Sequence, residues 1–308
     1  MSPSVFRFAP SPNGHLHLGH ALSALLNARA ASATGGRFLV RIEDIDQTRC
    51  TPQLEAELLE DLAWLELEYE RPVLRQSEHF ADYAKALARL EAMGLVYRGY
   101  LTRAEIRRHV EAEDRAGRLW PRDPDGAPLY PRDDMVLTAD ELAARAASDA
   151  PYALRLDMAR ALSLAGQDLT WRECPSEVPR DGAVPSNWNV PEIVPADPGA
   201  WGDVVLARKD TPTSYHLSVV VDDARQGITD VLRGRDLYAA TSVHRLLQSL
   251  LDLPEPSYRH HRLILGEDGR KLSKSRQDTG LRALREAGWN LARLRAAIDV
   301  FDPLGVFS

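Results

Sequence analysis

The sequence predicts an α/β protein built on a doubly wound sheet, with an inserted α+β subdomain and a short helical tail. A short β-like run at 5–8 leads into a loop with two prolines and a glycine, and an amphipathic helical run covers Leu18 to about Ser32. A β-rich run follows at 37–42, and strand-like runs return after residue 203. This order is typical of a Rossmann-type nucleotide-binding domain split by an insertion. We expect the first half of that domain at residues 1–96 and its second half at 197–256. The insertion is expected between them, at 97–196, and a C-terminal part with the KLSKS loop and a helical tail at 257–308.

The helices are expected from their apolar spacing and end signals. Residues 53–67 and 78–93 carry leucines and other apolar side chains at core spacing, and Gly94 ends the second run. Within the insertion, Thr102 and Thr138 each precede a glutamate by three residues, which is the capping-box pattern of a helix start.

The remaining strands are expected at 152–158, 203–208, 215–221, 228–232 and 258–265. We interpret 215–221 as a mostly buried strand, which would place Asp222 and Asp223 at its carboxyl end. Asp236 is expected to open a helix that runs through Leu251. The stretch 175–198, rich in Pro, Gly, Asn and Ser, predicts a long, partly mobile connection. Two short helices are expected in the tail, over 281–287 and 290–298.

The composition is that of a globular chain. Its 308 residues are 44% hydrophobic, enough for a large core, and no apolar run approaches the roughly 20 residues of a membrane helix. The first ten residues lack a signal-like apolar region, so we expect a cytoplasmic protein and no membrane contact. Cys50 and Cys174 are interpreted as two reduced thiols. We expect a monomer.

The charge is unevenly distributed along the chain, whose net charge is −7. Residues 43–91 hold thirteen acidic and five basic residues, whereas residues 258–308 hold ten basic and six acidic ones. Binding to nucleic acid requires a local positive track over phosphates rather than a basic chain. The C-terminal part therefore stays compatible with a contact to nucleic acid.

The loop after the first strand carries the first candidate site. Residues 7–20 read RFAPSPNGHLHLGH, and His17 and His20 lie three apart at the expected helix start. Unpaired main-chain N–H groups and the helix dipole favour anions there, and both histidines can donate to a phosphate. Taken alone, the motif is better explained by two surface histidines that cap a helix.

A second loop, KLSKS at 271–275, changes that interpretation. Together with HLGH at a first strand–helix junction, it resembles the class I aminoacyl-tRNA synthetases. RIEDIDQTR at 41–49 and VVVDDARQGITDVLRGRDL at 219–237 resemble the glutamyl branch. Only 33 residues follow Ser275, fewer than the 100 or so expected for an anticodon-binding domain. This favours the family of glutamyl-queuosine tRNA(Asp) synthetases, which are glutamyl-tRNA synthetase paralogues without that domain.

The resemblance implies a set of site residues. The residues expected to hold ATP are His17, Gly19, His20, Lys271 and Lys274. The two histidines and two lysines among them are also expected to be catalytic. Those expected to hold glutamate are Arg7, Ser11, Glu43, Tyr215 and Arg233. Arg233 would select the side-chain carboxylate, and Glu43 would grip the α-amino group. From position alone, Glu43 belongs to a solvated acidic turn and Tyr215 to the core.

The insertion departs from part of the family. Many relatives place a Cys-x-Cys pair where this chain has Gly-Tyr-Leu at 99–101, and a later cysteine position corresponds to Asp134. Zinc needs about four N, S or O ligands, and glycine and leucine supply none. We therefore predict no metal here and expect packing to hold the subdomain, with Tyr97, Tyr100 and Tyr130 filling the space.

The expected reaction is activation of L-glutamate by ATP, with Mg²⁺ bound to the ATP, and transfer of glutamate to the queuosine base of tRNA(Asp). The acceptor is implied by the resemblance alone. One alternative is a truncated glutamyl-tRNA synthetase that charges tRNA(Glu). A second is a non-catalytic paralogue that binds glutamate or nucleotide. A third is another HxGH nucleotidyltransferase that acts on a small acid.

Overall fold

The computed structural model of the chain describes residues 3–166, 168–177, 183–264 and 280–300, with residues 299 and 300 described by their backbone alone. The strands it shows are β1 (Val5–Phe8), β2 (Arg37–Ile42), β3 (Leu74–Arg75), β4 (Val96–Gly99), β5 (Ala153–Leu156), β6 (Thr170–Glu173), β7 (Glu192–Pro195), β8 (Val205–Arg208), β9 (Asp230–Gly234) and β10 (Ser257–His261). The α-helices are α1 (Leu18–Ala33), α2 (Pro52–Trp64), α3 (Phe80–Ala92), α4 (Arg103–Arg115), α5 (Ala139–Ala147), α6 (Met158–Ala165), α7 (Tyr215–Arg225), α8 (Thr241–Leu250), α9 (Leu281–Glu286) and α10 (Leu291–Val300).

Within the described ranges, one seven-stranded sheet has the order β3-β2-β1-β9-β10-β6-β7. All neighbouring pairs are parallel except β6 and β7. The chain runs outward from β1 to β2 and β3 and then returns to the other side of β1 as β9. The doubly wound fold is confirmed, and its switch point lies between β1 and β9. Ligands bind at such a point, beyond the carboxyl ends of the strands.

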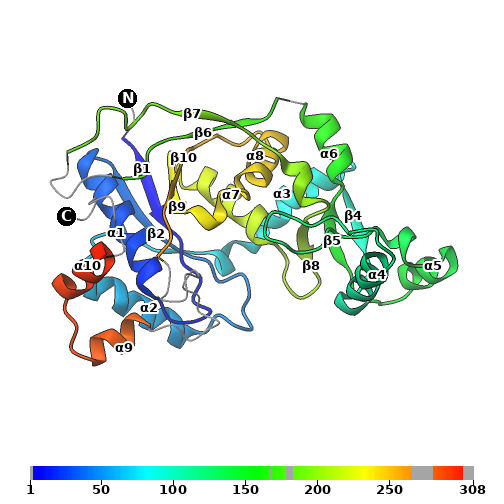
Figure 1. Cartoon of the computed structure of the whole chain (residues 1–308), viewed down its shortest axis with the longest axis horizontal. Coiled ribbons are helices and arrows are strands. Elements are labelled where there is room, and N and C mark those ends of the chain that lie inside the picture. The colour runs from blue at the N-terminus through cyan, green and yellow to red at the C-terminus, as the bar shows by residue number, and fades with distance from the viewer. Residues whose placement is uncertain (1–2, 167, 178–182, 265–279, 301–308) are drawn as a thin grey trace.

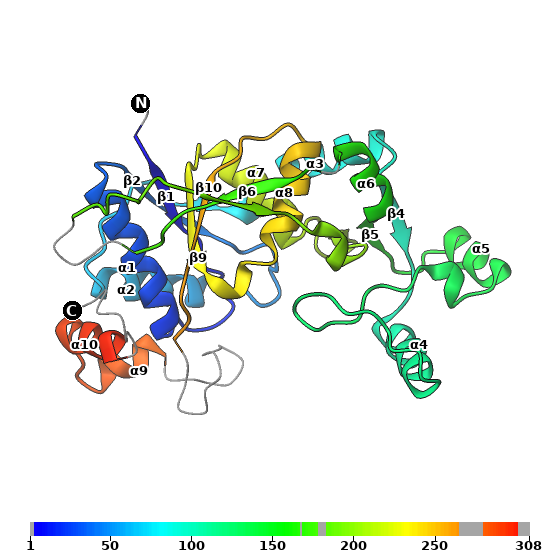
Figure 2. The ribbon, with the colours of Figure 1, turned by 45° about the horizontal axis from the view of Figure 1, so that its top comes forward.

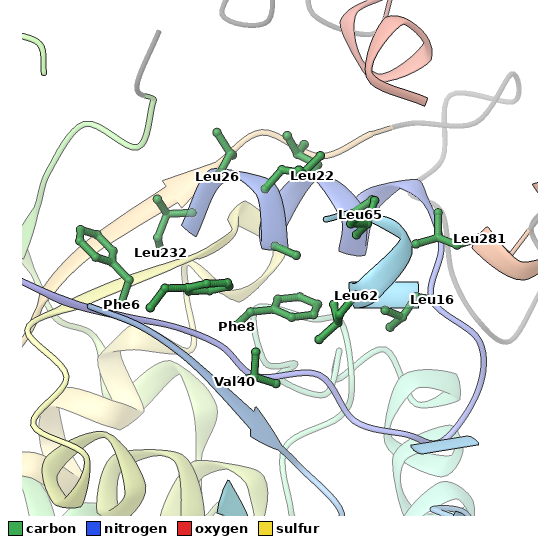
Figure 3. Close-up of a cluster of buried hydrophobic side chains, with 14 of the residues drawn as sticks. Phe6, Phe8, Leu16, Leu22, Leu26, Val40, Leu62, Leu65, Leu232 and Leu281 are labelled. Carbon is green, nitrogen blue, oxygen red and sulfur yellow. The ribbon is translucent and has the colours of Figure 1, made fainter. Parts of the chain in front are cut away.

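Alternation along the central strands separates two faces of the sheet. Phe6 and Phe8 of β1 belong to a core under α1 and α2, together with Leu22 and Leu62 (Figure 3). Arg7, between the two phenylalanines, meets the opposite layer and pairs with a carboxylate of α7. The same strand therefore supplies apolar side chains to the core and a cation to the other face.

The tail closes the first core. Leu281 and Leu284 of α9 and Leu294 and Ile298 of α10 are buried in the same cluster. Figure 3 shows Leu281 beside Leu16, which precedes α1. The two predicted tail helices are confirmed, and their apolar side chains hold the end of the described chain against the HLGH loop.

The prediction of a strand over 215–221 was wrong. This segment is helix α7, which begins after Ser214, whose side chain accepts a bond from the N–H of Leu217. Its residues between 217 and 223 are almost all buried, because the helix packs against α3, α8 and β8. Because the helix is buried on several sides, its sequence is rich in valine and lacks a polar face, a pattern that is also typical of a buried strand. Asp222 and Asp223 therefore lie in the last turns of a helix, not at a strand end.

The segment between α3 and α7 contributes to both sheets. Strands β4, β5 and β8 form a three-stranded antiparallel sheet, whereas β6 and β7 extend the main sheet. Strand β7 lies within the stretch 175–198, which was expected to be a long, partly mobile connection, and β6 was not expected at all. The limits expected for the insertion, 97 and 196, therefore differ from the limits of the sheets.

Helices α4 and α5 project from the three-stranded sheet at the end of the molecule away from α1 (Figures 1 and 2). Both begin with the capping boxes predicted at Thr102 and Thr138. Strand β5 and the end of α3 at Gly94, which has a positive φ, also agree with prediction. In the ranges listed above, no helix combines the length and apolar character needed to cross a bilayer.

Candidate active site between β1 and β9

A cavity of about 420 Å³ lies beyond the carboxyl ends of β1 and β9. Strand β1 and its following loop form one side, and the end of β9 with the residues after β10 forms the other. Every described residue expected at the site lines this cavity, namely Arg7, Ser11, His17, Gly19, His20, Glu43, Tyr215 and Arg233. The structure thus brings the two predicted sets together around one space, and their chemical roles stay predictions.

The two histidines cap α1 reciprocally. The Nδ1 atom of His17 accepts from the N–H of Gly19, and Nδ1 of His20 accepts from the N–H of His17, both at 3.1 Å. A neutral ring that accepts through Nδ1 carries its proton on Nε2, a donor suited to phosphate oxygens. A Cβ atom at position 19 would lie 3.1 Å from the His17 ring, so glycine permits this close packing. The capping interpretation is confirmed and remains compatible with binding of an anion.

A buried ion network supports the wall formed by β1 and β2. The Arg7 Nε atom lies 3.0 Å from Asp223 Oδ1, and the same oxygen accepts from Arg41 NH1 at 2.8 Å. NH2 of Arg41 lies 3.3 Å from Glu43. Burial raises the pKa of Asp223, but Arg7 and Arg41 outweigh it and hold that pKa below its ordinary value. Asp223 therefore stays ionised and fixes both guanidinium groups.

Glu43 lies at the far end of this network and faces the cavity. Burial, together with repulsion from Asp223 and Asp222, raises the pKa of Glu43 above its ordinary value, although Arg41 and Arg7 lower it. The arginines do not fully offset the cost of burying the charge of this carboxylate, so a bound cation would stabilise its ionised form. The position suits an α-ammonium group.

Arg233 stands on β9, on the same face as Arg7. Its guanidinium is buried and donates to Tyr215, His244 and His260, among other neutral groups. Tyr215 is the first residue of α7, and burial raises its pKa, so its hydroxyl stays neutral. The error about α7 left the position of Tyr215 in the site unaffected.

Two further polar side chains of the cavity wall are the hydroxyl of Ser11 and the imidazole of His261. The Ser11 hydroxyl lies 3.6 Å from the sulfur of Cys50. His261 is buried, and its Nδ1 lies 2.7 Å from the carbonyl oxygen of Arg262, which assigns the proton to Nδ1. Its Nε2 atom is buried without a hydrogen-bond partner in the described chain. A ligand N–H or O–H would satisfy this acceptor.

Lys271 and Lys274 lie outside the described residues, within 265–279. Of the residues near the ends of that segment, one lies at the cavity and the other against the residue that precedes His17. Ile264 lines the cavity, and Leu281 donates a main-chain hydrogen bond to the carbonyl of Leu16 at 2.7 Å.

Hydrogen bonds hold the part of the insertion where many relatives carry cysteines and this chain does not. Tyr130 and Asp133 are hydrogen-bonded to each other, and the N–H of Leu101 donates to the Tyr130 hydroxyl at 3.2 Å. Asp133 also accepts from the N–H of Tyr100. A Cβ atom at position 99 would lie 2.7 Å from the Tyr130 hydroxyl, so the tyrosine uses the space that glycine leaves. Within the described ranges, no group of three His, Cys, Asp or Glu side chains is arranged to hold a metal ion.

A second cavity of about 610 Å³ adjoins the first and shares Ser11, Glu43 and Tyr215 with it. It extends toward the three-stranded sheet, where Arg155, Trp201 and other residues line it. The site is therefore open on the side of the insertion.

Sequence reasoning missed three residues that hold site arginines in place. Asp223 was recognised as acidic but assigned to a strand end. His244 and His260 were not singled out, although both are buried and His260 pairs with Arg233 across strands β10 and β9. A histidine inside an apolar helical run, as at 244, was the available signal.

Comparisons with known proteins show the family of this chain. The family model described as "tRNA synthetases class I (E and Q), catalytic domain" matches residues 4–298. A glutamyl-Q tRNA(Asp) synthetase of Rhodobacter capsulatus is 44% identical over 301 residues, which cover 96% of this chain and 100% of that protein. A glutamate–tRNA ligase 2 of Methylobacterium sp. is 37% identical over 94% of this chain and 58% of its own length.

Among solved structures, a glutamate tRNA ligase from Elizabethkingia meningosepticum in complex with its amino acid is similar, with a TM-score of 0.65 and 25% identity. The similarity covers 94% of this chain and 54% of that protein. This chain thus spans just over half the length of these two ligases but the full length of the Rhodobacter relative. The match over residues 4–298 and the near-full-length identity show that this chain belongs to the class I tRNA synthetases (E and Q), and it is accordingly an enzyme of the ligase type.

Proposed function

We propose that this enzyme activates L-glutamate with ATP and transfers the glutamyl group to the queuosine base in the anticodon of tRNA(Asp). The observation that carries the first step is the cavity at the β1/β9 switch point, where two buried arginines and the partly exposed Glu43 line the same space as the start of α1. A dicarboxylic amino acid and an anionic nucleotide have complementary charges to these groups.

The amino acid pocket has a donor or acceptor for each charged group of glutamate. Asp223 engages Nε and NH2 of Arg7, and no hydrogen bond from a described residue engages its NH1, which can bind a substrate carboxylate. Glu43 would accept from the α-ammonium group. Arg233 would receive the side-chain carboxylate, and glutamine would leave its charge without an anion.

The nucleotide would bind at the helix start. Phosphate oxygens would accept from Nε2 of His17 and His20 and from main-chain N–H groups at the start of α1. Lys271 and Lys274, with the Mg²⁺ that accompanies ATP, would neutralise charge on the phosphates. The buried Nε2 of His261 offers an acceptor for a ribose hydroxyl or an adenine amino group.

The chemistry needs no covalent enzyme intermediate. A carboxylate oxygen of glutamate attacks the α-phosphorus, the bond to the bridging oxygen of the β-phosphate breaks, and pyrophosphate leaves. An acceptor hydroxyl then attacks the activated carbonyl carbon, an ester forms, AMP leaves and the hydroxyl proton passes to solvent. Positioning and charge stabilisation supply the rate enhancement.

The second cavity supports a transfer step, because it meets the first at Ser11, Glu43 and Tyr215 and opens toward the insertion. An acceptor nucleoside entering there would reach the activated carboxyl without displacing AMP. Support for tRNA(Asp) and queuosine comes from the Rhodobacter relative, which this chain matches over that protein's whole length.

The test measures esterification of purified tRNA with labelled glutamate. We expect product with tRNA(Asp) that contains queuosine, including tRNA from which the 3′-terminal adenosine has been removed, and none with tRNA(Asp) that lacks queuosine. Charging of tRNA(Glu) that depends on its 3′-terminal adenosine would instead support the alternative suggested by the Methylobacterium relative. Absence of glutamate activation would favour a non-catalytic binding protein.

A further inference from the structure

We propose that His244 and His260 are positioning residues that hold Arg233 through uncharged acceptors, so that its full charge is available to the side-chain carboxylate of the substrate. This inference rests on the proposed function, because it concerns how the same pocket selects glutamate. Neither histidine lines the cavity, and both act through Arg233.

Arg233 is held on every nitrogen of its guanidinium. Nε donates to His260 Nε2 at 3.1 Å, and NH1 lies 3.1 Å from His244 Nδ1 and donates to the Tyr215 hydroxyl at 3.4 Å. NH2 donates to the Thr241 hydroxyl at 2.7 Å and to the carbonyl of Leu237 at 3.1 Å. These five acceptors equal the five N–H groups of an arginine, and all of them are neutral. The long contact to Tyr215 is the weakest and can be exchanged for a ligand oxygen.

The contacts fix the tautomers of the histidines. Because Arg233 only donates, His260 must accept through Nε2 and carry its proton on Nδ1, which lies 2.8 Å from Glu173. His244 must accept through Nδ1 and carry its proton on Nε2, which lies 3.2 Å from Nδ1 of His216. Each ring is thereby oriented from behind by a second group.

A comparison with the other buried arginines shows what is unusual here. The described chain buries four arginines, namely Arg7, Arg41, Arg233 and Arg259. Asp223 pairs with the first two, and Asp230 pairs with Arg259. Within the described ranges, Arg233 has no carboxylate at ion-pair distance, and Glu173 is separated from it by the His260 ring. A buried cation without a paired anion is unfavourable until a ligand supplies one.

The histidines stay neutral in this position. Burial, aided by repulsion from Arg233, lowers the pKa of His216 to about 4 and that of His244 well below its ordinary value. Burial also lowers the pKa of His260 to about 4, although the bond to Glu173 opposes the shift. Protonation would remove the acceptor lone pair and place a second cation beside Arg233.

Uncharged acceptors explain a preference for a carboxylate over an amide. An aspartate in place of His244 would hold the guanidinium equally well but would neutralise it. A glutamate substrate would then gain little over glutamine, since the charge it compensates would already be paired.

The experiment uses paired substitutions in the full chain, assayed by tRNA-free ATP–pyrophosphate exchange. The asparagine oxygen takes the place of histidine Nδ1, and the glutamine oxygen takes the place of Nε2. His244→Asn and His260→Gln therefore keep the acceptor for Arg233, whereas His244→Gln and His260→Asn keep only the contact behind the ring. We expect the KM for glutamate to rise roughly 10- to 100-fold in the second pair and to stay within about threefold in the first. The KM for ATP should stay within about twofold in all four.

The charge requirement is tested by His244→Asp against His244→Asn, which have the same shape and differ in charge. We expect the aspartate variant to lose at least about tenfold of the glutamate-over-glutamine preference that the asparagine variant retains. Circular dichroism establishes whether each variant is folded. If a variant at 244 is not, His260→Gln against His260→Asn still tests the requirement for an acceptor.

The inference would be overturned if His244→Asn and His244→Gln had equal KM values for glutamate and His260→Gln and His260→Asn did too. Equal selectivity of the folded His244→Asp and His244→Asn variants would also overturn it. A wild-type chain without glutamate-dependent exchange would instead overturn the proposed function. The two failures are distinguishable because the second appears before any substitution is made.

Discussion

The main-chain N–H of Leu281 donates a 2.7 Å hydrogen bond to the carbonyl oxygen of Leu16. Leu16 directly precedes His17 in the HLGH loop, and Leu281 follows the KLSKS sequence closely as the first residue of α9. Ile264, on the other side of the segment 265–279, lines the cavity. The described residues on the two sides of the segment 265–279 are therefore placed at the cavity and against the HLGH loop.

This placement makes Lys274→Ala a test of the role that sequence reasoning gave to that lysine. A cation that acts on the phosphates as charge develops should affect the rate more than the binding of glutamate. We expect the kcat of tRNA-free exchange to fall roughly 100-fold or more, with the KM for glutamate within about threefold. Arg282→Ala, which removes an exposed cation of α9 paired with Glu57, serves as the control and should leave both constants unchanged. Equal effects on kcat and KM would argue against this role.

Asp223→Asn should impair both stability and binding of glutamate. The substitution removes the charge that two buried guanidinium groups, of Arg7 and Arg41, share. We expect the free energy of unfolding to fall by about 3 kcal/mol, measured by urea denaturation, and the KM for glutamate to rise with it. Asp149→Asn, in an exposed pair with Lys209, should leave the unfolding midpoint in place. An unaltered glutamate KM in the folded variant would show that Asp223 does not position Arg7.

Tyr130→Phe tests whether hydrogen bonds hold the insertion. The variant loses the bond to Asp133 and the acceptor for the N–H of Leu101. We expect a loss of about 2 kcal/mol in the free energy of unfolding, because these partners are largely buried. Tyr69→Phe, which removes a surface hydroxyl bonded to Arg71, should change it little. Treatment with a chelator should leave the melting temperature of the wild type unchanged, and a fall would indicate a structural metal.

Asp61 should give a distinct pH dependence of stability. It is buried on α2 beside Arg285 of α9, and burial raises its pKa to about 6, against the opposing effect of Arg285. Between that value and the ordinary pKa near 4, the native state binds a proton that the unfolded state lacks, so this contribution to stability increases as pH falls. The difference in free energy of unfolding, wild type minus Asp61→Asn, should therefore increase from pH 7 to pH 5. A constant difference would mean that Arg285 keeps Asp61 ionised throughout.

Much of the fold and the site could be predicted because the signals were local. The alternation of Phe6, Arg7 and Phe8, the two capping boxes and the HLGH loop each follow from neighbouring residues. Helix α7 could not be recognised, since contacts with α3 and α8 bury it on several sides and remove its amphipathic pattern. The sequence could mark His244 as unusual but could not pair it with Arg233, because α8 and β10 meet the end of β9 only in three dimensions.

Strand β6 was missed for a related reason. It pairs with β10 at a single position, Glu173 with Tyr258, and its register depends on that tertiary contact rather than on a long apolar run. Its glutamate nevertheless orients His260, so an unpredicted strand contributes indirectly to the pocket.

Activation of glutamate in a pocket selected by Arg233 is tested most directly by ATP–pyrophosphate exchange without tRNA, comparing wild type with Arg233→Ala. We expect exchange with the wild type that depends on glutamate and is not supported by glutamine or aspartate. The variant, folded by circular dichroism, should show none, because a buried guanidinium that pairs with the substrate carboxylate has been removed. Exchange at the wild-type rate in Arg233→Ala would contradict the pocket assignment, and its absence from the wild type would contradict the proposed reaction.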